Sequence, residues 1–212
     1  MARRGSGRSS PYKRPDRFTK QAQREGYAAR SVYKLQEIQR RQPILRRGQR
    51  VVDLGCAPGS WFVYAAEQVG ERGVVVGVDL EEPVSRPPWA KAIVGSALDT
   101  PAEVLREALG GPADVVLSDM APRTTGDPTG DHFVQIELAR RALALAAELL
   151  VPGGAFVCKV VDGEDAPAFV DEVRAAFDKV KRYKPEATRD RSREFFVVGA
   201  GFKGATAAPP PP

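Results

Sequence analysis

The chain has 212 residues, of which 42% are hydrophobic, so it is long enough for one domain with a buried core. No apolar run is long enough to cross a bilayer, and the basic N-terminus lacks the apolar segment of a secretory signal, so we expect a cytoplasmic protein. The two cysteines, Cys56 and Cys158, stand apart, and His132 is the single histidine. These counts argue against a disulfide framework, a metal site and a Ser-His-Asp triad.

Charge is unevenly distributed, although the formal total is +5. Residues 1–50 contain 15 Lys and Arg against three acids, whereas the rest of the chain contains 17 against 24. A basic segment attached to an acidic body favours an anionic polymer as partner. For residues 1–15 alone, a solvated tail that only aids solubility is an equal alternative.

The elements follow in chain order. Residues 1–17 lack periodicity and predict a flexible basic arm. Apolar residues recur at helical spacing over 18–41, where Ser31 is a candidate cap and Pro43 stops the helix. After Gly48, strand and helix patterns alternate, which favours a parallel sheet with crossover helices. The predicted strands cover 50–54, 74–79, 91–94, 113–118, 155–160, about 179–184 and 195–199. The predicted helices cover 60–69, 101–109, 131–150 and 165–177.

Two segments near the C-terminus are typical of irregular structure. Pro152-Gly153-Gly154 predicts a turn between the long helix and the strand that follows it. Residues 203–212 end in four prolines and predict a disordered tail.

The most informative stretch runs from Val51 to Trp61. An apolar run contains Asp53 and is followed by a turn with Gly55 and Gly59, then by an amphipathic run. This is the strand–turn–helix at which α/β sheets bind nucleotide-like ligands. The turn lacks both the G-x-G-x-x-G and the phosphate-loop patterns, which disfavours a nicotinamide-dependent oxidoreductase. An acid beside glycines suits a ligand with hydroxyls and a positive charge, such as S-adenosylmethionine.

Further charged residues lie at predicted strand ends. Asp79 closes the second strand, where a carboxylate can accept a ribose hydroxyl, and Asp119 follows the fourth. Lys159 lies inside an apolar strand, where a lysine needs a partner or a function; the alternative is that it points from a sheet edge into water. Glu194 begins the last strand, where a glutamate is more often a surface residue.

Together these segments resemble the FtsJ/RrmJ family of ribose 2′-O-methyltransferases, in particular its bacterial large-subunit rRNA branch. Any one motif can arise by chance, whereas the ordered set is highly specific and spans about residues 20–203. The matching segments are Ser31 to Leu35, Asp53 to Trp61, Ser118 to Pro122, Pro152-Gly153-Gly154, Lys159, and Ser192 to Glu194.

The resemblance implies an α/β fold: a single Rossmann-like class I S-adenosylmethionine-dependent methyltransferase domain. The implied seven-stranded sheet is mostly parallel and has helices on both faces. The implied domain covers residues 18–202, and its helical segment 18–41 is expected to face the RNA. The family's catalytic constellation maps onto Lys34, Asp119, Lys159 and Glu194, and no metal is implied. Its cofactor site maps onto Gly55, Gly59, Trp61, Asp79, Ser96 and Asp119.

One position departs from the family's pattern. Relatives usually place an acid after the third strand, where this chain reads Gly95-Ser96. Ser96 offers a hydrogen bond but no charge, which predicts weaker cofactor binding. Asp99, three residues later, is a possible compensating acid.

The chemistry that the resemblance implies centres on Lys159. Apolar neighbours favour its neutral amine, which would accept the 2′-hydroxyl proton, with Lys34 pushing in the same direction. Asp119 favours the ammonium, which would instead orient the hydroxyl and stabilise negative charge on oxygen. Sequence leaves both roles open, and Lys34 and Glu194 complete the frame around the target ribose.

A second basic cluster flanks Glu194 and is a candidate RNA contact. Tyr183 within it can stack on a base or simply pack. The cluster consists of Lys179, Lys181, Arg182, Lys184, Arg189, Arg191 and Arg193.

The resemblance therefore predicts an enzyme that methylates the ribose 2′-OH of a uridine in 23S rRNA of the large ribosomal subunit. We also expect a monomer, because a small chain with a tail that can reach RNA does not need a partner subunit. A tRNA ribose 2′-O-methyltransferase is the first alternative. The second, from another class, is an assembly factor that binds RNA on the same fold without turnover; the four constellation residues argue against it.

Overall fold

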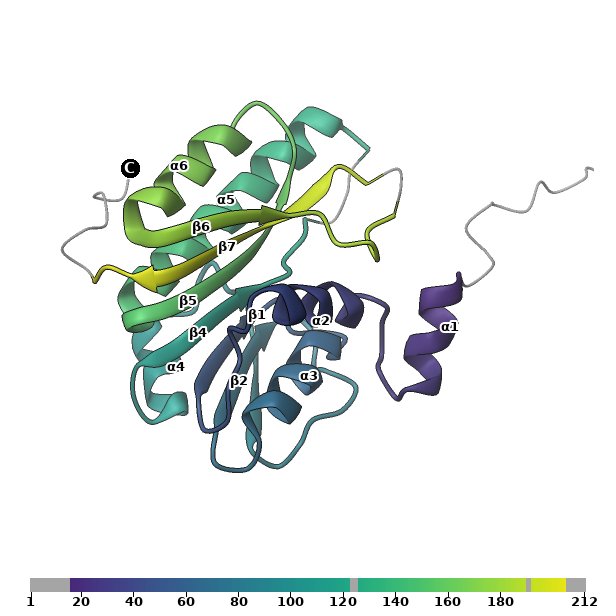
Figure 1. Ribbon diagram of the computed structural model, residues 1–212, viewed down its shortest axis with the longest axis vertical. Coiled ribbons are helices and arrows are strands. Elements are labelled where there is room, and N and C mark those ends of the chain that lie inside the picture. Colours follow the sequence, from purple (N-terminus) through teal and green to yellow (C-terminus); the bar gives the residue numbers. More distant parts are fainter. Residues whose placement is uncertain (1–15, 123–125, 190–191, 205–212) are drawn as a thin grey trace, which may run out of the picture.

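The computed structural model describes residues 16–122, 126–189 and 192–204, so most of the predicted arm and tail lies outside the described residues. The described chain forms a seven-stranded sheet flanked by helices (Figure 1). The strands are β1 (Arg50–Leu54), β2 (Val74–Asp79), β3 (Ala90–Val94), β4 (Ala113–Ser118), β5 (Leu150–Val161), β6 (Phe177–Tyr183) and β7 (Glu194–Phe202). The helices are α1 (Arg17–Arg24), α2 (Val32–Arg41), α3 (Ser60–Val69), α4 (Ala102–Leu109), α5 (Pro128–Leu149) and α6 (Ala166–Ala176).

The strand order is β3-β2-β1-β4-β5-β7-β6, and the sheet is parallel from β3 to β5. The last strand, β7, lies between β5 and β6 and is antiparallel to both. The predicted, mostly parallel seven-stranded α/β sheet is thus confirmed. β7 is antiparallel to the other strands at its side. Its first residue, Glu194, therefore lies at the end of the sheet that carries the carboxyl ends of the parallel strands.

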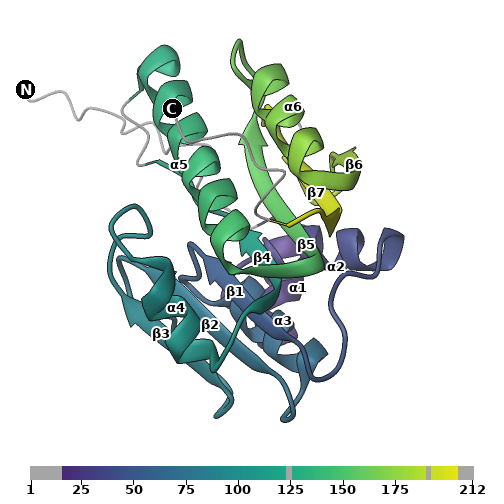
Figure 2. The ribbon, with the colours of Figure 1, turned by 90° about the vertical axis from the view of Figure 1, so that its left-hand side faces the viewer.

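Helices cover both faces of the sheet, as two views at right angles show (Figures 1 and 2). α4, α5 and α6 pack on one face, over a core that includes Leu54, Val116 and Phe156. α2 and α3 pack on the other, over a core that includes Val51 and Phe196. Neighbouring residues of a strand therefore enter different cores, as the two-residue period of a strand requires. No helix within the described ranges is both long and apolar enough to cross a membrane.

Two predicted elements differ from the structure. The helical segment 18–41 is divided into α1 and α2, because Gly26 has a φ of +82°, a conformation that ends a helix. Ser31 precedes α2, but its own backbone is already helical and its side chain makes no capping hydrogen bond. The predicted turn at 152–154 lies inside β5, where the register with β4 shifts between Ala113 and Val115.

Candidate active site

The turn after β1 joins the ends of three neighbouring strands. Gly55 has a φ of +81°, and a Cβ there would lie 2.9 Å from Cγ and 3.0 Å from the backbone nitrogen of Met120, which follows β4. Only glycine fits this conformation and this close approach. The amides of Gly55 and Cys56 both donate to the carbonyl of Val78 in β2. Gly59, with a φ of +122°, caps the N-terminus of α3.

Three aspartates lie at the carboxyl ends of the adjacent strands β2, β1 and β4. The carboxylate of Asp79 accepts hydrogen bonds from the amides of Ala57 at 2.9 Å and Glu81 at 3.1 Å. Asp53 is fully buried, and neither of its carboxylate oxygens has a hydrogen-bond partner among the described residues. Burial raises the pKa of Asp53 well above its usual value, and the nearby Asp119 and Asp79 carboxylates raise it further. A buried acid without a partner suits a cationic ligand.

The end of β3 completes this edge. The amide of Gly95 donates to the carbonyl of Asp79 at 2.8 Å. The next residue, Ser96, therefore lies close to the end of β2. The hydroxyl of Ser96 accepts the amide of Leu98 at 3.2 Å and thereby shapes its own turn. Asp99, the acid three residues later, is exposed. Roles for Ser96 and Asp99 toward a cofactor stay predictions.

Trp61 is buried, and it links three elements. Its indole N–H donates to the carbonyl of Ser31 at 2.8 Å, which ties α3 to the start of α2. Its ring lies against that of Phe196 in β7, with 5.5 Å between the centroids. These contacts explain why a tryptophan is needed here for packing, and its predicted contact with a cofactor stays a prediction.

Lys159 is held by Asp119 inside the sheet. Its Nζ donates to the backbone oxygen of Asp119 at 2.6 Å and lies 3.1 Å from Oδ1 of the same residue. The Lys159 side chain is only 9% exposed. Because β5 lies between β4 and β7, the alternative of a lysine at a sheet edge is wrong. The buried lysine has the partner that its cost of burial requires.

Lys34 and Glu194 form the second ion pair of the site. The side chains of both residues are largely buried, and the Lys34 ammonium also lies 5.7 Å from the centroid of the Phe196 ring. In the β5–β7 register Lys159 is opposite Phe196, and Val161 is opposite Glu194. The side chains of Lys159, Phe196 and Glu194 therefore share the face of the sheet that α2 covers.

The structure thus brings the four predicted constellation residues together at one edge. Two lysines, each paired with an acid, lie near Phe196: Lys159 is opposite it in the β5–β7 register, and the Lys34 ammonium lies 5.7 Å from its ring centroid. Such a set can bind a hydroxyl and stabilise charge that develops on its oxygen. Within the described ranges, no group of three or more His, Cys, Asp and Glu is placed to hold a metal ion.

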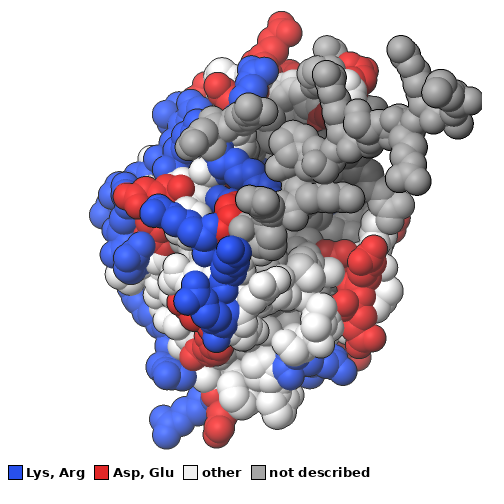
Figure 3. All heavy atoms as spheres, turned by 90° about the vertical axis from the view of Figure 1, so that its right-hand side faces the viewer, with Lys and Arg blue, Asp and Glu red and all other residues white. Residues whose placement is uncertain are grey.

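The predicted basic cluster lies on and after β6, except for Arg191, which is outside the described residues. Figure 3 looks onto the end of the molecule that carries α1 and shows Lys and Arg gathered along one side of it. Tyr183 is anchored by a hydrogen bond from its hydroxyl to Oε1 of Gln42 at 3.1 Å and packs against the core under α2. This contact favours the packing role of Tyr183 over base stacking.

The sequence singled out Asp53 together with the glycine turn, although its lack of a partner is visible only in the fold. Sequence reasoning missed Arg30, which pairs with Asp16 and donates to the carbonyl of Ala187. Burial and Arg189 lower the pKa of Arg30, whereas Glu194 raises it. Nothing in the sequence pattern distinguishes Arg30 from other arginines.

Comparison with known proteins agrees with this geometry. A family model described as FtsJ-like methyltransferase matches residues 27–202. Ribosomal RNA large subunit methyltransferase E of Desulfatibacillum aliphaticivorans is 50% identical, over 90% of this chain and 92% of the relative. The protein of the same name from Sorangium cellulosum is 48% identical, over 92% of each.

A solved structure shows the same fold. A Plasmodium falciparum protein described as a ribosomal RNA methyltransferase superposes with a TM-score of 0.73 at 24% identity, over 84% of this chain and all of that one. The family match over most of the chain and the two relatives settle the classification. The chain belongs to the FtsJ-like methyltransferase family.

Proposed function

We propose that this methyltransferase transfers a methyl group to the ribose 2′-hydroxyl of a uridine in 23S rRNA of the large ribosomal subunit. The observation that carries the proposal is the pairing of buried Lys159 with Asp119 beside the Lys34–Glu194 pair, on a chain about half identical to ribosomal RNA large subunit methyltransferases E. The names of these relatives favour large-subunit rRNA over tRNA. Four retained constellation residues favour an enzyme over a non-catalytic assembly factor.

We propose S-adenosylmethionine as the cofactor, which supplies an electrophilic methyl group when bound. The buried, partnerless carboxyl of Asp53 supports the choice of a cationic ligand, and Asp79 is proposed to accept a ribose hydroxyl. Gly55 and Gly59, both with a positive φ, shape the turn at the same end of the sheet. Trp61 and Ser96 are proposed to complete this site.

Lys159 is the central group of the proposed mechanism. A carboxylate oxygen 3.1 Å from its Nζ favours the ammonium form. In that form Nζ holds the 2′-oxygen of the ribose in line with the methyl group and stabilises negative charge on this oxygen. Such alignment contributes ~7–11 kcal/mol in well-oriented systems. The hydroxyl proton would leave to water, and the methyl group would pass to the 2′-oxygen as its carbon–sulfur bond breaks, with the electron pair of that bond left on the sulfur of the cofactor.

Lys34 and Glu194 are proposed to hold the target ribose from the side of α2. Their ion pair fixes both side chains, so little further ordering is needed when the ribose arrives. The basic cluster around β6 and the basic residues 1–17 would bind the RNA backbone and make affinity depend on salt. Folded rRNA would supply specificity through its shape. We further propose that the protein acts as a monomer in the cytoplasm.

Methyl transfer from labelled S-adenosylmethionine tests the proposal. Isolated large subunits, naked rRNA and bulk tRNA are compared, with nuclease mapping of the labelled nucleotide. We expect a 2′-O-methylated rRNA nucleotide on subunits. Label on tRNA alone would overturn the choice of substrate, and cofactor binding without label on any RNA would favour the assembly factor.

A further inference from the structure

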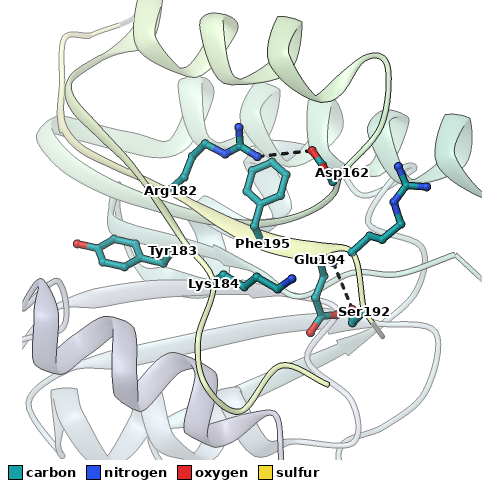
Figure 4. A pocket seen from close by; sticks show the side chains of 8 residues that line it. Asp162, Arg182, Tyr183, Lys184, Ser192, Glu194 and Phe195 are labelled. Carbon is teal, nitrogen blue, oxygen red and sulfur yellow. Dashed lines mark hydrogen bonds and ion pairs between the residues drawn. The ribbon is translucent and has the colours of Figure 1, made fainter. Parts of the chain in front are cut away.

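A recess of about 380 Å³ lies immediately beside the constellation, between the end of β6 and the start of β7 (Figure 4). Glu194 lines it, whereas Asp53, Asp79 and Asp119 do not, so it is distinct from the proposed cofactor site. Its volume lies in the range of small-ligand sites. The lining residues are Asp162, Arg182, Tyr183, Lys184, Ser192, Arg193, Glu194 and Phe195.

One wall of the recess is a flat, cationic platform. The guanidinium of Arg182 lies over the ring of Phe195, with 3.8 Å from Cζ to the ring centroid, and pairs with Asp162 at 3.6 Å. Two partners therefore fix its plane, yet 48% of the Arg182 side chain is exposed. A guanidinium fixed on one face and open on the other is a surface on which a nucleobase stacks.

The rest of the recess supplies charge and a hydroxyl. Among the described residues, the side chains of Lys184 and Arg193 have no ion-pair partner, and both line the hollow. In Figure 4 the Lys184 side chain extends toward Glu194. The hydroxyl of Ser192 accepts the amide of Glu194 at 3.2 Å, which leaves its proton free to donate. Two such cations beside a platform match a phosphate joined to a base.

From this arrangement we propose that the recess binds the nucleotide next to the methylated one, with its base on Arg182 and its phosphate on Lys184 and Arg193. The proposal rests on the proposed function, because it places the target ribose at Glu194. The recess can accept only a nucleotide that is unstacked from its neighbours, so the substrate is single-stranded at this point. Stacking on a guanidinium discriminates little between bases, so the site selects an open strand rather than a sequence.

The experiment separates the phosphate contacts from the stacking contact. In Lys184→Ala/Arg193→Ala, we expect KM for large subunits to rise about tenfold, with kcat and cofactor affinity unchanged. The salt slope of RNA affinity should fall by about 0.7 for each phosphate that the protein no longer neutralises. Arg46→Ala/Arg72→Ala is the matched control, because it removes the same charge from exposed loops before β1 and β2, at the opposite edge of the sheet.

Arg182→Lys tests the platform, since it keeps the charge and removes the plane. We expect weaker binding of an oligouridylate by about tenfold, at an unchanged salt slope, and no effect on an abasic ribose-phosphate oligomer of the same length. The proposal would be overturned if Arg182→Lys lost equal affinity for both oligomers. It would also be overturned if Lys184→Ala/Arg193→Ala had the same KM and salt slope as the control. Wild type could bind oligouridylate with the expected dependence on Arg182 and yet methylate no large subunit. That result would overturn the proposed function but keep the recess as a nucleotide-binding site.

Discussion

The ammonium of Lys34 and the carboxylate of Glu194, 160 residues apart in the chain, form an ion pair that fastens α2 to the first residue of β7. The pair closes one side of the site, and Glu194 lies on the same face of the sheet as Lys159, which pairs with Asp119. Because both members are largely buried, neither charge is well solvated without the other. The N-terminal helical segment is therefore part of the site and not only an attachment to it.

Lys34→Met should lower the free energy of unfolding by about 1–3 kcal/mol, because it leaves the Glu194 carboxylate buried without its partner. Lys34→Met/Glu194→Gln should recover most of that stability, since no unpaired charge remains, yet both variants should be inactive. Urea unfolding and methyl transfer measure the two effects. Arg174→Met is the control, because it breaks an exposed pair with Asp171 and should cost less than about 1 kcal/mol. A double variant no more stable than Lys34→Met would contradict this account.

Lys159→Ala should abolish methyl transfer and leave S-adenosylmethionine affinity nearly unchanged, because the lysine is proposed to act on the ribose. The affinity is measured by calorimetry and the transfer with labelled cofactor. Lys91→Ala, which removes an exposed lysine of β3, is the control and should keep full turnover. Loss of cofactor binding together with activity would show that Lys159 supports the cofactor site instead.

The dependence of kcat on pH separates the two roles of Lys159. An ammonium that holds the 2′-oxygen predicts activity that is level near neutrality and falls at alkaline pH, as the charge is lost. A neutral amine that accepts the hydroxyl proton predicts activity that rises in proportion to hydroxide concentration before it levels. The second profile would overturn the proposed ammonium role and restore the general base.

Much of this site was predictable because its residues occur at strand ends. Parallel strands gather their carboxyl ends at one edge, so Asp79, Asp119 and the Gly55–Gly59 turn had to lie near one another. The apolar neighbours of Lys159 likewise predicted burial and a partner. These inferences depend on local pattern and on sheet geometry that is common to the fold class.

Other features depend on contacts between distant segments, which local pattern does not contain. The reversal of β7 places Glu194 at the functional edge, and no periodicity within the strand reveals its direction. The break between α1 and α2 follows from one positive φ at Gly26, although the apolar spacing continues across it. The stacking of Arg182 on Phe195 joins two strands and is visible only in three dimensions.

Asp53→Asn should make the free chain more stable at neutral pH and weaken cofactor binding. The pKa of Asp53 is higher in the folded chain than in the unfolded chain. The residue therefore contributes its full stability at a pH below its unfolded-state pKa, and this contribution is lost as the pH rises through its folded-state pKa. The extra stability of Asp53→Asn over wild type should therefore become smaller as the pH is lowered. Asp178→Asn, at an exposed position of β6, is the control.

Urea unfolding at several pH values and titration with S-adenosylmethionine test the Asp53 prediction together. We expect cofactor affinity to fall by about tenfold in Asp53→Asn, since asparagine cannot ionise beside a bound cation as the carboxyl can. A variant that gains stability but keeps full cofactor affinity would remove Asp53 from the proposed cofactor site. A variant destabilised equally at every pH would instead show that the carboxyl is needed for packing.

Tyr183 offers a direct choice between packing and RNA stacking. Tyr183→Phe removes the hydrogen bond to Gln42 and should cost about 1 kcal/mol of stability, with no change in KM for large subunits. Tyr183→Leu also removes the aromatic ring and should cost more stability, yet leave KM and the salt slope of RNA binding unchanged. The partly buried ring packs against the core under α2, which favours a packing role. An increase in KM in the leucine variant alone, at a temperature where both variants are folded, would assign the ring to a base of the substrate.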